Sequence, residues 1–116
     1  MISEDFKRIM EVVTERTGVT RKQILAGNGK HHIILARQTV CWLMRLRKHT
    51  FQQIAKLIGT HHGTVIHACK TINNRLEVDS DFRVIWPELL GRNIRFTSSE
   101  KQKENKRKLL ELVEDK

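Results

Sequence analysis

The chain has 116 residues, of which 39% are hydrophobic, so it has room for one domain with a buried core but not for two of ordinary size. No stretch approaches the roughly 20 apolar residues of a membrane span, and charged residues interrupt the N-terminus where a signal peptide would be apolar. These features predict a cytoplasmic protein with no membrane partner, and the net charge of +9 points to an anionic partner.

Two helices are predicted before residue 30. Ser3 can cap the first, which should end at Gly18, and Thr20 can cap a shorter one over residues 20–25. The apolar residues of the first helix recur at the spacing of one helix face: Phe6, Ile9, Met10 and Val13. Glycines at 27 and 29 predict a loop that ends in Lys30 and two histidines, and this loop is either a second contact for a partner or a plain linker.

A long third helix is predicted over residues 33–47. Its apolar residues repeat at helical spacing, and its arginines fall between them, so we expect the arginines to face outward. Cys41 in this helix and Cys69 further along both lie in apolar patterns, which favours buried thiols over a disulfide or a metal site.

Residues 51–76 predict a helix-turn-helix. Thr50 can cap a first helix over residues 51–58, and a second helix should run from His61 or His62 to about residue 76. The spacing between them fits the motif: Ala55 is small where the helices meet, Gly59 permits the turn, and Val65 fills the angle between the helices.

The second of these helices should have one buried and one exposed face. The apolar positions that share a face are Val65, Cys69, Ile72 and Leu76. The opposite face carries Gly63, His67, Lys70 and Asn74, with Thr64 and Thr71 beside them. Such a small, polar and basic face is typical of a helix that enters the major groove of DNA.

The surplus of positive charge lies in one part of the chain. Residues 20–76 contain ten Lys or Arg, all six histidines and no Asp or Glu, whereas the other twelve basic residues are balanced by all thirteen acidic ones. A long segment without carboxylates is expected where phosphates dock, and a merely solvated basic face is the less favoured interpretation.

The C-terminal part is predicted with less detail. Residues 79–90 could form a helix, although Pro87 must lie in its first turn or break it. We place the domain at residues 1–96 and a charged tail at residues 97–116. The tail either forms an amphipathic helix around Leu109 to Val113, docked on the domain or free, or is disordered.

One segment resembles a known family. Residues 59–72, Gly-Thr-His-His-Gly-Thr-Val-Ile-His-Ala-Cys-Lys-Thr-Ile, are similar to the signature of the C-terminal DNA-binding domain of the bacterial chromosomal replication initiator, the DnaA family, and the likeness covers about residues 6–95. The resemblance implies an all-α, Trp-repressor-like domain that binds a short duplex box, with the helix-turn-helix in the major groove and a basic loop in the minor groove. The resemblance implies that His62, Thr64, His67, Lys70, Arg37 and Gln38 contact DNA. To these we add Lys30 as a phosphate contact from the loop, and the neighbours His61, Gly63 and Thr71.

The chain departs from this family pattern in three places. His61 replaces an Asp, Gly63 replaces the first Thr of the signature, and the loop around Lys30 lacks the family's run of arginines. The resemblance therefore implies DNA binding without implying the initiator's preferred box. The chain also has no phosphate-binding loop and no room for an ATPase domain, so it cannot be a full initiator.

The residues give less support to other functions. A zinc site could draw on His31, His32, His61, His62, His67 and Cys69, but the pair His62 and His67 is spaced i, i+5 rather than i, i+4. Catalysis would need a carboxylate to orient a histidine, and RNA stacking would need exposed aromatics, which are scarce. We therefore expect no enzyme activity, no cofactor, no metal and no small-molecule substrate.

The sequence predicts a role in replication initiation or its regulation through sequence-specific binding of double-stranded DNA. The alternative is a transcription regulator or a protein-interaction module that has kept the fold, with the tail binding a protein partner. A free-standing domain would suit a phage or mobile element, or a nucleoid-associated bacterial protein, and Met1 with the distinct tail favours a complete small protein over an excised domain.

Overall fold

The computed structural model describes residues 1–27 and 29–89. Over these residues the chain forms helices and no strand, which confirms the all-α prediction. In chain order the elements are α1 (Ile2–Thr17), α2 (Arg21–Leu25), α3 (His31–Leu46), α4 (Phe51–Ile58), α5 (His62–Val78), α6 (Ser80–Ile85) and the 3-10 turn η1 (Pro87–Leu89).

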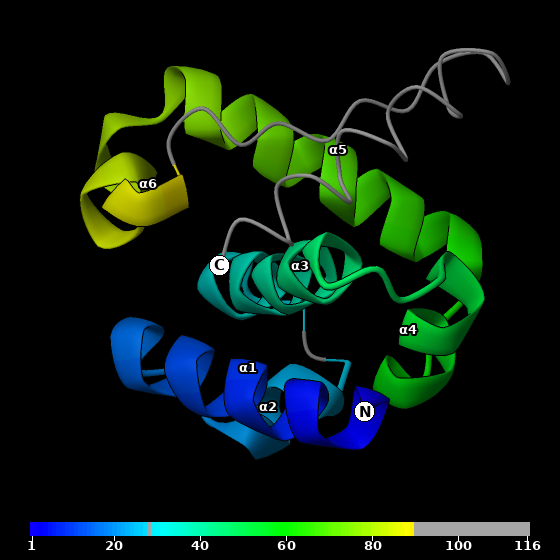
Figure 1. The fold of residues 1–116 in the computed structure, drawn as a ribbon. Helices are drawn as coiled ribbons and strands as arrows, with labels where there is room; N and C mark the ends of the chain where they lie inside the picture. Colours follow the sequence, from blue (N-terminus) through cyan, green and yellow to red (C-terminus); the bar gives the residue numbers. More distant parts are fainter. Residues whose placement is uncertain (28, 90–116) are drawn as a thin grey trace, which may run out of the picture.

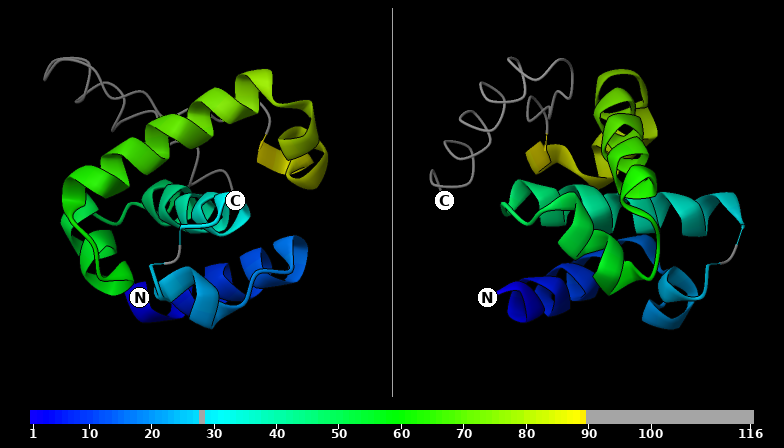
Figure 2. Two further views of the ribbon diagram at one scale, coloured as in Figure 1. Left: turned by 180° about the vertical axis from the view of Figure 1, so that it is seen from behind. Right: turned by 90° about the vertical axis from the view of Figure 1, so that its right-hand side faces the viewer.

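The central element is α3, with α1 on one side of it and α5 crossing on the other (Figures 1 and 2). It contributes eight buried residues, more than any other helix, and Trp42 among them is completely buried. The indole Nε1 of Trp42 donates a hydrogen bond of 2.8 Å to the Oδ1 of Asn73, so α3 and α5 are joined by a polar contact inside an apolar interface. This contact fixes the helix that carries the candidate site against the core.

Two of the predicted helix caps are confirmed. The side chains of Thr20 and Thr50 accept hydrogen bonds from the backbone N–H groups of Gln23 and Gln53, each at 3.1 Å. The two glutamine side chains in turn accept from the backbone N–H of the threonines, which completes a capping box at each helix. The cap predicted at Ser3 is wrong, because α1 already begins at Ile2 and leaves Ser3 inside its first turn.

Three other boundaries differ from the sequence prediction. Helix α3 begins at His31, two residues early, and α5 runs on to Val78. The helix predicted over residues 79–90 is interrupted, since α6 ends at Ile85 and η1 begins at Pro87. Proline has no N–H to donate and clashes with the preceding turn, so it can start the 3-10 turn but cannot continue α6.

Two arginines of α3 do not face outward as predicted. The Arg45 guanidinium is half-buried, lies 4.4 Å from the centroid of the Phe51 ring and donates to the carbonyl of His49. Arg37 Nε donates to the carbonyl of Ile24 at 2.6 Å. When the aliphatic stem of an arginine packs inside, its guanidinium can still donate to a backbone carbonyl or lie over an aromatic ring. The spacing of apolar residues alone does not reveal such a contact.

The expected boundary at residue 96 and the tail at 97–116 lie outside the described residues. No helix in residues 1–27 and 29–89 combines the length and apolar character that crossing a bilayer requires.

Candidate nucleic-acid interface

The helix-turn-helix has the geometry that its sequence predicts. Helix α4 ends at Gly59, whose φ of 81° lies in the left-handed region that favours glycine. The backbone N–H groups of Gly59 and Thr60 both donate to the carbonyl of Ala55, at 2.8 and 2.9 Å, and close the turn. Val65 is 0% exposed in the angle between α4 and α5. The turn therefore holds α5 at a fixed angle to α4.

Helix α5 has two distinct faces, as predicted. Its buried residues are Val65, Ala68, Cys69, Ile72 and Leu76. Its exposed residues up to position 74 are His62, Gly63, Thr64, His67, Lys70 and Asn74. Thr71 is half-buried, and its hydroxyl donates to the carbonyl of His67 at 2.9 Å, so this hydroxyl can offer only its lone pairs to a partner.

His61 caps α5. Its ring Nδ1 accepts a hydrogen bond of 3.1 Å from the backbone N–H of Gly63, which is the role of an N-cap oxygen in other helices. The absence of a side chain at Gly63 leaves room for this ring, since a Cβ there would lie 3.3 Å from Nδ1. The two residues that depart from the family signature in this turn are thus in direct contact. An imidazole can accept at Nδ1 only when that nitrogen carries no proton.

The other end of α5 meets the loop before α3. Arg75 donates to the Nε2 of His31 at 3.1 Å and forms an ion pair of 2.7 Å with Asp79. Lys30, next to His31, is exposed at the N-cap of α3. The structure therefore places His31, at the end of the predicted loop, beside the C-terminal part of α5. Sequence reasoning missed this link, because nothing in the spacing of His31 and Arg75 signals it.

Arg37 and Gln38 are less accessible than the α5 residues. Both are half-buried on α3, and Arg37 ties α3 to α2 through its bond to Ile24. Gln38 lies seven residues after His31, which is close to two helical turns, so the two share one side of α3. Gln38 is thus aligned with the loop end, whereas Arg37 also has a structural role.

The exposed cations of this region are not neutralised within the described part of the chain. Lys30, Lys56 and Lys70 make no ion pair with any residue of 1–27 and 29–89. No carboxylate occurs in residues 20–76 to compete for them. The surface around α4 and α5 therefore offers its positive charge to an external anion.

The cysteines do not add chemistry to this surface. Both are buried free thiols, as predicted, and burial raises the pKa of Cys41 to about 12 and also raises the pKa of Cys69. Thiols held protonated in an apolar environment are poor nucleophiles and poor metal ligands. In the described residues no three His, Cys, Asp or Glu side chains are grouped so that they could hold a metal ion.

Comparison with known proteins gives one family. A family model described as the bacterial dnaA protein helix-turn-helix matches residues 6–72, a range that includes α4, the turn and most of α5. No solved structure matches the chain significantly.

Curated relatives carry the same name in several bacteria. The chromosomal replication initiator protein DnaA of Bacteroides thetaiotaomicron is 34% identical over 83 residues, which are 70% of this chain and 18% of the relative. Those of Porphyromonas gingivalis and Chloroflexus aggregans are 32% and 30% identical over 79 and 77 residues, each covering 65% of this chain and 16% of the relative. The chain thus spans less than a fifth of the length of these relatives.

Proposed function

Because the chain belongs to the family of the bacterial dnaA protein helix-turn-helix, we propose that it binds double-stranded DNA sequence-specifically through α5 and acts in replication initiation or its regulation. The observation that carries the proposal is the exposed face of α5. His62, Thr64, His67 and Lys70 lie on it without a carboxylate, while the opposite face is fixed in the core.

The roles of the individual residues follow from their chemistry. Thr64 can place its methyl group against a thymine methyl, and His62 and His67 can donate to acceptors on base edges. Lys70, one turn further along, would meet phosphates and contribute affinity without discrimination. His61 and Gly63 position this end of α5 through the cap, and Thr71 can accept a hydrogen bond from a partner.

The position of the loop supports a second contact in the next groove. His62 and Arg75 are thirteen positions apart, which is about 20 Å along an α-helix. Half a turn of B-DNA measures roughly 17 Å, so a protein that reaches the major groove with His62 and Thr64 could bring Lys30 near the adjacent minor groove. Gln38 and Arg37 would then lie toward the backbone between these two contacts.

The biological setting is part of the proposal. A protein with this function would work in the cytoplasm where bacterial chromosomal, phage or mobile-element DNA lies, and we assign it binding rather than catalysis. The tail contains apolar residues beside charges, so a protein that binds residues 97–116 is a second proposed partner. Removal of residues after Ser98 should abolish binding of such a protein and leave DNA affinity unchanged.

Selection from a random double-stranded DNA library near physiological salt tests the function. Wild type should enrich a short motif, and a Thr64→Ala, His67→Ala variant should lose it. A matched control is Lys7→Ala, Glu11→Ala, which changes two exposed residues of α1 and should enrich the wild-type motif. If wild type enriches nothing while it retains affinity for any duplex, sequence-specific binding is wrong. If it binds no duplex, the DNA function itself is wrong.

A further inference from the structure

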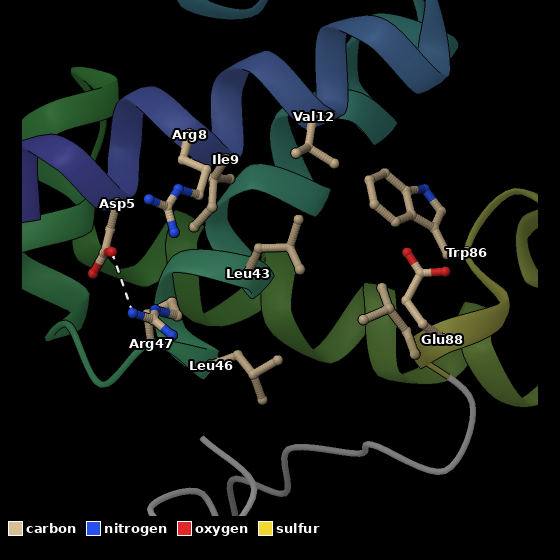
Figure 3. A pocket seen from close by; sticks show the side chains of 10 residues that line it. Asp5, Arg8, Ile9, Val12, Leu43, Leu46, Arg47, Trp86 and Glu88 are labelled. Carbon is tan, nitrogen blue, oxygen red and sulfur yellow. Dashed lines mark hydrogen bonds and ion pairs between the residues drawn. The ribbon is translucent and has the colours of Figure 1, made fainter. Parts of the chain in front are cut away.

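A second surface lies away from the helix-turn-helix. An open pocket of about 410 Å³ is formed by α1, the C-terminal part of α3 and the segment that includes η1. Its apolar lining consists of Ile9, Val12 and Leu43, which are half-buried, and of Leu46, Trp86 and Leu89, which are at most 2% exposed. In Figure 3 Val12, Leu43 and Trp86 face the same space from three parts of the chain. Its volume falls within the range of about 300–1,000 Å³ that is common for ligand-binding clefts.

The charged groups around this pocket leave one cation uncompensated. Asp5 is held by Arg47 at 3.4 Å and by His49 at 2.8 Å, and Glu88 pairs with Arg16. Arg8, which also lines the pocket, forms no ion pair with another residue of the described part of the chain. An occupant that suits the pocket is therefore apolar on one side and carries negative charge beside it.

The chain supplies a segment of this composition. Residues 109–115 read Leu-Leu-Glu-Leu-Val-Glu-Asp, with Leu109, Leu112 and Val113 at the i, i+3, i+4 spacing of one helix face. Residues 109–115 also contain three carboxylates and no basic residue, whereas residues 97–108 contain five Lys or Arg and two Glu. Within residues 97–116, only this stretch is both apolar and acidic.

The chain also leaves the described domain at the pocket. Leu89, the last described residue, is itself one of the lining residues. Nineteen residues, 90–108, connect it to Leu109, and an extended chain of that length can span about 60 Å. The longest dimension of the molecule is 37 Å, so the segment can return to the pocket without strain.

We propose that residues 109–113 dock in this pocket, with Leu109, Leu112 and Val113 against its apolar lining and the carboxylates of Glu111 and Glu114 near Arg8. The segment lies beyond the part of the chain that matches the initiator family. No residue of α5 lines the pocket, so docking and DNA binding occupy different surfaces. A protein partner of the tail would have to compete with the domain's own pocket.

A spin label near the end of the tail tests the proposal in the full chain. Asp115→Cys introduces the one accessible thiol, because Cys41 and Cys69 are buried and resist labelling. Attached there, a nitroxide should weaken the methyl signals of Val12, Leu43 and Leu89 in NMR spectra far more than that of Ile34, which lies about 14 Å from Leu43 along α3. The effect should persist on dilution, since docking is within one chain.

Two tail variants separate apolar docking from mere proximity. Leu109→Asp, Val113→Asp in the labelled chain should restore the pocket signals, whereas the control Gln102→Asp, Asn105→Asp adds the same charge elsewhere in the tail and should leave them suppressed. Arg8→Glu, at an exposed position, should restore them in part. The proposal is overturned if the label leaves the pocket signals intact, if its effect disappears on dilution, as for a second copy, or if the apolar variant behaves like the control.

Discussion

The exposed face of α5 and the surface around the pocket differ in whether their charged side chains are paired within the protein. On the pocket side, Asp5 pairs with both Arg47 and His49, and Arg16 pairs with Glu88. On α5, Lys70 has no acid among the described residues with which to pair, and no carboxylate occurs from residue 20 to residue 76. The contrast indicates that most charge near the pocket holds the fold together, whereas the charge on α5 is available to a ligand.

Arg75 is the cation of α5 that is paired within the protein. It belongs to the segment without carboxylates, residues 20–76, but in the structure its guanidinium pairs with Asp79 and donates to His31. Backbone donation from Phe82 lowers the pKa of Asp79, and Arg75 lowers it further, so the carboxylate remains charged beside the arginine. Arg75 therefore positions the loop end, and its charge is partly used within the protein.

The largest expected effect is the difference in the free energy of unfolding between substitutions on the two faces of α5. Ile72→Ala removes a side chain that is 0% exposed and should lower the free energy of unfolding by about 2–5 kcal/mol. Asn74→Ala, on the exposed face of the same helix, should change it by less than about 0.5 kcal/mol. Urea unfolding measures both, and equal losses would mean that α5 does not pack through the Ile72 face.

Thr64→Ala should weaken binding at one base position by about 1–3 kcal/mol and leave the remaining positions unchanged. Fluorescence anisotropy with duplexes substituted one base pair at a time measures this. Thr14→Ala in α1 removes the same groups on another helix and provides the control. A uniform loss over all positions would assign Thr64 to the DNA backbone instead.

Lys70→Ala should weaken binding to cognate and scrambled duplexes alike and reduce the slope of log K against log salt by about one. Lys7→Ala, which removes an exposed charge from α1, should leave that slope unchanged. Equal slopes for the two variants would mean that Lys70 contacts DNA phosphates no more than Lys7 does.

His61→Ala should destabilise the start of α5 by about 1 kcal/mol, because it removes the acceptor for the Gly63 N–H. His62→Ala removes a neighbouring exposed histidine that is not the cap and should have a smaller effect on unfolding. Thermal unfolding of both variants measures the difference, and a larger loss for His62→Ala would contradict the cap.

The smallest effect concerns Asp5. Partial burial raises its pKa, but the hydrogen bond from His49 and the charge of Arg47 outweigh this and hold the pKa below the ordinary 3.8. A carboxyl whose pKa is lowered by folding stabilises the protein above its ordinary pKa, and that contribution is lost as pH falls through the folded value. Asp5→Asn should cost about 0.5–1 kcal/mol at pH 7, and the difference from wild type should shrink below about pH 4. Unfolding measured against pH checks this, and DNA affinity should not change.

Local chemistry explains which parts of the fold were predictable. Thr20, Thr50 and Gly59 act within a few residues of their positions, so caps and the turn could be read from spacing, and the two faces of α5 follow from its 3.6-residue period. Ser3 failed as a cap because Ile2, preceding it, can also join the helix. The interrupted end at Pro87 was one of two predicted outcomes, and the structure decides between them.

The remaining features depend on contacts between helices. The half-buried Arg45 lies over Phe51 of the next helix, and the bond from Arg75 to His31 and the pocket between α1 and η1 join segments far apart in the sequence. The apolar period of a single helix does not reveal such contacts. The candidate DNA contacts on α5 were predictable because they share one helix. The cap at His61 could have been predicted, because its side chain has an acceptor atom and lies two residues before the N–H of Gly63. Histidine, however, is an uncommon N-cap.

The most direct measurement of the central claim is an NMR titration of the full chain with the duplex that selection identifies. We expect amide shifts at residues 61–71 and 29–31, and little change in α1 and around the pocket. Shifts centred on α1, Trp86 and Leu89, with residues 61–71 unaffected, would contradict the assignment of the α5 face to DNA.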